Sequence, residues 1–350
     1  MAQLQSLGRY EIRGVLGKGA MGLVYDGYDA TLARRVAIKT VLTSTLDEAS
    51  ARHYAMRFQR EVRAAARLNH PHIVRVYDFG TQSELAYVVM EYIEGRELKA
   101  CFEAKEQFAL KTILRLMSEL LDALDFAHEA GVIHRDVKPG NVMIDRRGHA
   151  KLTDFGVARL TDAARDDGEA TRAGALIGTP SYMSPEQVQG EAVDRRSDIF
   201  SAGVLFYQWL TGRKPFEGEQ WAMMKKITQD DPVWPSLIVP VPEALDRVVA
   251  RALAKQPESR YPSARRFATA LKRIAEDKPP EDADETVLLT SARLSARVEA
   301  EIEFWNAVKD SNDPGDITLY LEQFPGGTFF EQAQRKLVQL KGELSSEKSG

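Results

Sequence analysis

The stretch His134-Arg135-Asp136-Val137-Lys138-Pro139-Gly140-Asn141 decides the fold, together with Asp154-Phe155-Gly156 further along the chain. It places a carboxylate that can orient a hydroxyl, Asp136, two positions before a lysine, Lys138. Asn141 and Asp154 add side-chain oxygens of the kind that Mg²⁺ binds. A carboxylate base, a cation and two metal ligands are the set that phosphoryl transfer requires.

A glycine-rich loop lies upstream, in Gly17-Lys18-Gly19-Ala20-Met21-Gly22-Leu23-Val24. Glycines at this spacing also open dinucleotide-binding folds and ordinary turns, so the loop alone leaves a plain hairpin as an even alternative. Residues 10–16 and 23–28 both alternate as strands do, which predicts a hairpin lid and no strand-to-helix turn. Because glycine has no β-carbon, this backbone can lie close over phosphates.

The next predicted strand, Val36-Ala37-Ile38-Lys39, carries a lysine into an apolar setting. A buried ammonium needs an acidic partner to stay charged. Residues 51–69 contain many good helix formers and are predicted to be a helix that carries Glu61. Taken alone, Glu61 is one more solvated helix charge. Beside the other motifs, a Lys39–Glu61 ion pair is the better interpretation.

In order and identity these motifs resemble the eukaryotic-type, or Hanks-type, Ser/Thr protein kinases of bacteria, over about residues 8–275. The resemblance implies an α+β bilobal protein-kinase fold, with a β-rich N-lobe over residues 8–90, a hinge at 91–93 and a mainly helical C-lobe over 94–275. It also implies that ATP and Mg²⁺ (or Mn²⁺) are used to phosphorylate Ser and Thr hydroxyls of protein substrates. A pseudokinase scaffold that binds nucleotide and acts through the C-terminal module is the alternative. A small-molecule kinase is disfavoured, because the segment ending at Ser184-Pro185-Glu186 resembles one that presents a polypeptide.

The same resemblance implies a role for each motif residue. Lys39 would hold the α- and β-phosphates and Glu61 would hold Lys39, while Asn141 and Asp154 would bind the metal. Asp136 would orient the substrate hydroxyl, and Lys138 would lie against the γ-phosphate. The hinge Glu91-Tyr92-Ile93 would present its backbone to adenine, with Met90 as gatekeeper, although the apolar residues here could equally be plain core. The expected nucleotide-binding residues are Gly17, Lys18, Gly19, Gly22, Val24, Ala37, Lys39, Met90, Glu91, Ile93 and Met143.

Residues 154–186 resemble an activation segment, with serine in place of the usual alanine before Pro185. Residues 161–174 offer little apolar area to bury, so we expect them to be mobile when unmodified. A phosphate on Thr171 would add a charge of about −1.5 to −2 and could order the segment through arginines. We therefore expect autophosphorylation at Thr171. The candidate partners of that phosphate are Arg135, Arg159 and Arg57.

Four further residues have supporting roles by resemblance. Thr179 resembles the threonine that hydrogen-bonds the catalytic loop, and Asp198 would support the backbone of that loop. Glu186 would pair with Arg260, although a lone charge of this kind is usually solvated. Residues 112–129 have apolar side chains at helical spacing, which predicts a buried helix without chemistry.

Composition agrees with a globular enzyme: of 350 residues, 44% are hydrophobic and 28% charged. The net charge of −4 gives no reason to expect nucleic acid as a partner. A single cysteine, Cys101, excludes an internal disulfide and suits a reducing cytosol. His70 and His72 flank a proline and are expected to be structural. Because no apolar stretch approaches the length of about 20 residues that spans a bilayer, we expect a cytoplasmic protein without a membrane span.

Composition changes after Ala275. Residues 276–292 are predicted to be an acidic linker, since residues 276–290 hold six acidic residues, one lysine and two prolines. Within it, Thr286 resembles phosphothreonine sites read by forkhead-associated domains, with Leu289 at the third position after it, and a plain solvated linker is the alternative interpretation. Residues 293–343 are predicted to be a small helical module with a regulatory or interaction role. A homodimer through the N-lobe is a further hypothesis, because Arg9, Leu32 and Asp78 occupy positions that resemble a dimer face.

Overall fold

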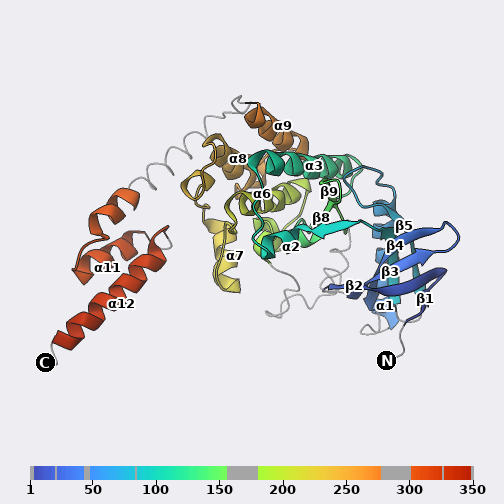
Figure 1. Ribbon diagram of the computed structural model, residues 1–350, viewed down its shortest axis with the longest axis horizontal. Coiled ribbons are helices and arrows are strands. Elements are labelled where there is room, and N and C mark those ends of the chain that lie inside the picture. Colours follow the sequence, from blue (N-terminus) through green and yellow to red (C-terminus); the bar gives the residue numbers. More distant parts are fainter. Residues whose placement is uncertain are drawn as a thin grey trace. The chain divides into compact units, whose positions relative to one another are not determined.

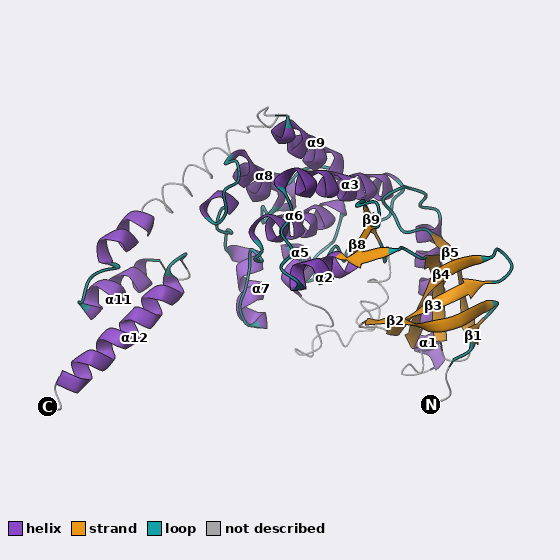
Figure 2. Cartoon of the chain, in the orientation of Figure 1, coloured by secondary structure: helices purple, strands orange, loops and turns teal. Residues whose placement is uncertain are grey.

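The computed structural model describes residues 4–19, 22–42, 48–82, 85–155, 180–276, 301–324 and 327–347. The chain divides into two compact units, Met1–Pro280 and Glu281–Gly350 (Figure 1). The first unit contains a β-rich lobe and a mainly helical lobe, coloured by secondary structure in Figure 2. The predicted α+β, bilobal architecture is therefore confirmed.

An antiparallel six-stranded sheet builds the first lobe, in the order β1-β2-β3-β4-β6-β5. Its central strands are apolar on both faces, because β4 buries Val36 and Ile38 on one side and Ala37 on the other. This alternation follows from the two-residue period of a strand. The strands are β1 (Ser6–Leu7), β2 (Tyr10–Gly19), β3 (Gly22–Asp29), β4 (Arg34–Leu42), β5 (Val76–Gln82) and β6 (Leu85–Glu91).

Helix α1 (Glu48–Ala66) packs on one face of this sheet (Figure 1). Its buried residues Phe58 and Val62 are four positions apart, the spacing that places side chains on one side of a helix. They meet Ala37, Val88 and Met90 of the sheet. The helix predicted for residues 51–69 is confirmed, with both ends displaced by about three residues.

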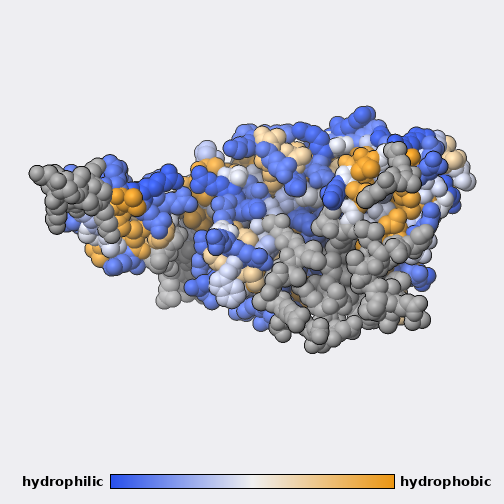
Figure 3. Space-filling model, turned by 90° about the horizontal axis from the view of Figure 1, so that it is seen from below, coloured by the Kyte–Doolittle hydropathy of each residue, from blue (hydrophilic) through white to orange (hydrophobic). Residues whose placement is uncertain are grey.

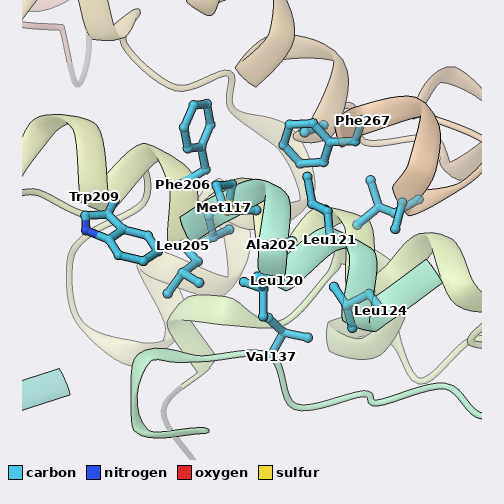
Figure 4. Close-up of a cluster of buried hydrophobic side chains, with 14 of the residues drawn as sticks. Met117, Leu120, Leu121, Leu124, Val137, Ala202, Leu205, Phe206, Trp209 and Phe267 are labelled. Atoms are coloured by element: carbon cyan, nitrogen blue, oxygen red, sulfur yellow. The ribbon is translucent and has the colours of Figure 1, made fainter. Parts of the chain in front are cut away.

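The second lobe is built around three helices, α3 (Leu110–Glu129), α6 (Arg195–Thr211) and α9 (Ala264–Ala275). Helix α6 is buried on nearly every side, so it forms the centre of the lobe. The buried helix predicted within residues 112–129 is confirmed as α3. Figure 4 labels the side chains that meet there: Met117, Leu120, Leu121, Leu124, Val137, Ala202, Leu205, Phe206, Trp209 and Phe267.

Shorter elements surround that core and connect it to the cleft. A small sheet, in the order β7-β8-β9, follows the hinge. The 3₁₀ helix Pro139–Asn141 directly precedes β8 and carries the end of the catalytic loop. The remaining elements are β7 (Gly95–Glu97), α2 (Leu98–Glu103), β8 (Val142–Asp145), β9 (Ala150–Leu152), α5 (Pro185–Gln189), α7 (Gln220–Gln229) and α8 (Ala244–Ala252).

The second unit is a small helical module. It contains a helix over residues 301–308, then α11 (Pro314–Gln323) and α12 (Phe330–Glu347). Trp305, Ile317 and Tyr320 form its core, and the Tyr320 hydroxyl donates to Glu301 Oε1 at 2.7 Å. Pro314 begins α11, where a missing N–H costs nothing.

On the face shown in Figure 3, hydrophilic residues cover most of the described surface and hydrophobic residues form separate patches. Among the residues described here, no helix is both long and apolar enough to cross a membrane.

Candidate active site

A cleft of about 710 Å³ brings the sequence motifs together. Its walls include the glycine-rich strands, the hinge and the catalytic loop, which lie far apart in the sequence. Most of the predicted nucleotide and catalytic residues line it: Gly17, Lys18, Val24, Ala37, Lys39, Met90, Glu91, Ile93, Asp136, Lys138, Asn141, Met143 and Asp154.

The glycine-rich stretch forms the predicted hairpin, in which β2 and β3 pair antiparallel and Gly19 lies opposite Gly22. Gly22 cannot be replaced without movement, because a β-carbon there would lie 2.0 Å from the Thr40 carbonyl oxygen. The Thr40 hydroxyl donates to the Leu23 carbonyl at 3.0 Å and accepts from the Leu23 N–H at 3.3 Å. These contacts attach the hairpin to β4, the strand that carries Lys39.

The fully buried carboxylate of Asp198 supports the backbone of the catalytic loop. Asp198 accepts the main-chain N–H groups of His134 at 2.8 Å and Arg135 at 2.6 Å. His128 Nε2 donates to the same carboxylate at 2.7 Å. Arg135 has a positive φ of 67°, an uncommon conformation for a residue with a β-carbon. The buried carboxylate therefore stabilises a backbone turn that would otherwise be unfavourable.

Asp136 has a defined orientation within this loop. Asn141 Nδ2 donates to Asp136 Oδ2 at 3.0 Å and to the Asp136 carbonyl at 2.8 Å. Lys138 Nζ lies 2.6 Å from Asp136 Oδ2, and both side chains are about one-third exposed. A carboxylate that is positioned by two neighbours and still open to the cleft can accept a proton from a bound hydroxyl.

Lys39 Nζ lies 2.8 Å from Asp154 Oδ2, and both side chains are mostly buried. Glu61, on α1, has an ion pair with Arg60, with Nη2 and Oε1 3.5 Å apart. The Lys39–Glu61 pair therefore stays a prediction. Asp154 has a φ of 66°, and Phe155 beside it packs edge-on against the His134 ring at 4.7 Å.

The part of the cleft beside the hinge has the apolar walls and the main-chain donor that a purine base requires. Val24, Ala37, Met90 and Met143 supply apolar walls to the cleft. The main-chain N–H of Ile93 has no hydrogen-bond partner within the described ranges, so a ring nitrogen can take it. A smaller cavity of about 30 Å³ shares Met90 with the lining of the cleft and is also bordered by Phe58 and Phe155.

Asn141 and Asp154 are the candidate metal ligands. Both line the cleft, and their donor atoms are an amide oxygen and a carboxylate oxygen. The part of the chain with described placement contains no group of three or more His, Cys, Asp or Glu side chains that could hold a metal. One or two oxygen ligands suit Mg²⁺ or Mn²⁺, because these cations keep waters and complete their shell with phosphate oxygens. The two residues therefore fit such an ion.

Glu186, on α5, and Arg260 form a bidentate ion pair. Arg260 Nη1 and Nη2 lie 2.7 Å and 2.8 Å from the two Glu186 oxygens, and both side chains are almost fully buried. Arg260 also donates to the carbonyls of Ala254, Lys255 and Arg196. Burial raises the pKa of Glu186, but hydrogen bonds from Arg260 and Ser197 outweigh it and lower that pKa to about 2.

Several supporting residues were missed by the sequence reasoning. Gln187 Nε2 donates to the Arg135 carbonyl at 2.8 Å, and its Oε1 accepts the Ser184 N–H at 3.0 Å. The S-x-x-Q pattern of a capping box was the available signal for the second contact. Tyr182 and Lys214 also line the cleft, and no local pattern marks them.

The remaining predicted sites fall in two groups. Thr171, Thr179, Thr286 and Arg159 lie outside the described residues, and so does the side chain of Arg57. On the N-lobe, Leu32 is more than half exposed, and Arg9 Nη2 lies 3.8 Å from Asp78 Oδ2. Asp78 also accepts the Tyr10 hydroxyl at 2.7 Å.

Comparisons with known proteins agree with this geometry. Residues 10–271 match the family model described as the protein kinase domain. Serine/threonine-protein kinase PknB of Mycobacterium tuberculosis is 40% identical over 297 residues, which are 81% of this chain and 46% of that protein. Serine/threonine-protein kinase PksC of Streptomyces coelicolor is 41% identical over 278 residues, which are 77% of this chain and 49% of that protein.

A probable serine/threonine-protein kinase of Streptomyces coelicolor is 40% identical over 279 residues, 78% of this chain and 41% of that protein. The chain thus spans less than half the length of these curated relatives. The match over residues 10–271 covers most of the chain, and the chain therefore belongs to the protein kinase family, where it is similar to bacterial members named serine/threonine-protein kinases.

Proposed function

We propose that this chain transfers the γ-phosphate of ATP to Ser and Thr hydroxyls of proteins, with Mg²⁺ or Mn²⁺ as the metal. One observation carries the proposal: Asp136 is oriented by Asn141 and Lys138 in the same cleft that holds Lys39 and Asp154. This arrangement has a base, two cations and two metal ligands around one site, as phosphoryl transfer requires. The names of the relatives support the same activity.

Each residue has a separate task in this proposal. Asp136 accepts the proton of the substrate hydroxyl, and Lys138 balances negative charge beside it. Lys39 binds phosphate oxygens, which requires that it exchange its present contact with Asp154 for one with Glu61. Asn141 and Asp154 would hold the divalent ion, which neutralises phosphate charge when bound.

The test is transfer of radiolabelled phosphate from ATP to the chain itself and to a basic protein substrate. We expect Asp136→Asn to lose activity by roughly 10²- to 10⁴-fold, the usual contribution of a general base. Asp122→Asn is the matched control, because Asp122 is an exposed carboxylate on α3 that pairs with His70. If the chain binds ATP but transfers no phosphate, the pseudokinase alternative replaces this proposal.

Autophosphorylation of Thr171 is part of the proposal, supported by its place in a segment of low apolar content. Mass spectrometry of the purified chain after incubation with ATP should find phosphate on Thr171. Thr171→Ala should lower specific activity, and a variant with unchanged activity and phosphate content would place the switch elsewhere.

Three assignments of partners and location complete the proposal. Thr286, once phosphorylated, would bind a forkhead-associated domain, which a peptide pull-down with and without the phosphate can test. The N-lobe would form a homodimer through Arg9, Leu32 and Asp78, and sedimentation of Leu32→Glu against the parent chain tests this. The chain would act in the cytoplasm, in keeping with its single, buried cysteine.

A further inference from the structure

The cleft is lined by a cation that the proposed chemistry does not use. Lys214 lies in the segment between α6 and α7, and its side chain is partly buried. Its Nζ donates to Ser181 Oγ at 3.1 Å and lies 5.6 Å from the centre of the Tyr182 ring. Both neighbours belong to one 3₁₀ turn just before α5. Lys214 is therefore fixed beside the segment that resembles one presenting a polypeptide.

The Lys214 ammonium has no carboxylate partner among the residues with described placement. Glu217 accepts only its main-chain N–H, at 3.2 Å. Five carboxylates line the cleft, and four of them are paired with lysines, as Asp136–Lys138, Asp154–Lys39, Glu91–Lys151 and Glu103–Lys99. The fifth is Glu97, and no ion pair joins it to Lys214 in the described ranges. A partly buried ammonium that contacts only a hydroxyl and a ring gains from an anionic partner, so the charge of Lys214 is available to a bound substrate.

A second hydrogen-bond donor lies at the same ring. Gln208, on α6, also lines the cleft, and its Oε1 accepts the Tyr182 hydroxyl. Its Nε2 has no hydrogen-bond partner in the part of the chain that the structure describes. An ammonium and an amide N–H are both donors, and together they match the two oxygens of a carboxylate. Lys214, Gln208 and the Tyr182 ring between them thus provide donors and a positive charge without an acidic group.

We propose that Lys214 and Gln208 form a subsite for an acidic side chain, Asp or Glu, of the polypeptide that receives the phosphate. Lys214 pairs with the substrate carboxylate, Gln208 donates a second hydrogen bond, and a basic side chain at the same place is repelled. The carboxylate lies in a part of the substrate that does not react, so the pair selects the substrate without taking part in the transfer. This inference rests on the proposed function and names the class of substrate that the site selects.

The experiment uses the full chain and peptides that contain one threonine, with a single glutamate, glutamine or lysine placed at each neighbouring position in turn. At one position the glutamate peptide should exceed the glutamine peptide roughly tenfold in kcat/KM, the scale of one hydrogen bond to a charged group. The lysine peptide should be the poorest substrate there. The preference should appear mainly in KM and should weaken as salt rises, because it comes from a charge pair made on binding.

Charge reversal separates specificity from a structural role. Lys214→Gln should remove most of the preference for glutamate, and Lys214→Glu should invert the order so that the lysine peptide becomes better than the glutamate peptide. A lysine that only supports Ser181 would, when replaced, lower transfer to all three peptides by one factor and leave their order unchanged. That result would overturn the subsite. Lys272→Glu is the matched control, because Lys272 is exposed on α9, and this variant should keep the order of the parent chain.

Peptide binding is a second readout that does not need catalysis. Fluorescence anisotropy with labelled peptides should show tighter binding of the glutamate peptide than of the glutamine peptide, and Lys214→Gln should remove that difference, with thermal melting as the check on folding. If the parent chain transfers no phosphate to any peptide or protein, the proposed function fails, and this difference in binding would still support the subsite. Transfer to all peptides without a preference for glutamate at any position would overturn this inference alone.

Discussion

Two sets of ion pairs in this molecule differ in how deeply they are buried. Glu186 and Arg260 are almost fully buried and make several further hydrogen bonds. In the cleft, Lys138 and Asp136 are about one-third exposed, and Lys39 contacts a residue expected to bind metal. Buried charges cannot change partners without leaving a charge unpaired, whereas partly exposed ones can. The first set therefore defines a scaffold, and the second is free to rearrange during a reaction cycle.

Removal of one partner from the buried pair should have the largest effect on stability. Arg260→Ala leaves the Glu186 carboxylate buried without its cation, which should lower the free energy of unfolding by about 3–5 kcal/mol. Chemical denaturation measures this change. Arg260→Met, combined with Glu186→Leu, removes both charges and should recover part of the loss. A single variant as stable as the parent chain would show that the pair does not define the scaffold.

The same pair should make the protein sensitive to acid. The pKa of Glu186 falls from its ordinary 4.5 to about 2 in the folded state. Its contribution to stability is therefore complete above pH 4.5 and is lost as the pH falls toward 2. A shift of this size corresponds to about 3 kcal/mol. Denaturant midpoints measured across this pH window should fall less steeply for Glu186→Gln than for the parent chain.

A change at Glu61, on α1, should affect activity and leave stability nearly unchanged. We expect Glu61→Gln to lower kcat/KM roughly ten- to a hundredfold, because a charge-assisted contact with Lys39 would be lost. The measurement is steady-state kinetics beside thermal melting. A variant with full activity would show that the Lys39–Asp154 contact is retained during turnover.

An ion pair at the surface should have the smallest effect. Arg96 Nη1 lies 2.8 Å from Glu106 Oε2, with the arginine side chain well exposed. Salt and water screen such a pair, so Arg96→Gln should leave the melting temperature unchanged within error. A clear destabilisation here would mean that exposure is a poor guide to which pairs stabilise this fold.

The sequence predicted the elements that depend on local period and on motif spacing. The hairpin of β2 and β3, the helix that carries Glu61 and the buried helix α3 were all recognisable, because strand and helix patterns repeat over a few residues. The capping box of Ser184 and Gln187 is also a local pattern, because its two residues are three positions apart.

Contacts between residues that are remote in the sequence could not be predicted from such local patterns. His128 and Gln187 support the catalytic loop through Asp198 and Arg135, and neither contact has a local signature.

The sequence by itself determined which chemical groups this protein possesses and on which kinds of elements they lie, since both follow from residue type and short-range pattern. Only the tertiary structure decided which charged side chains form ion pairs with one another and how deeply each pair is buried. Lys39 is the clearest case, because the motif assigns it Glu61 and the fold places it 2.8 Å from Asp154. The strength of a charge pair depends on burial and distance, and both arise from packing between segments that are remote in the chain.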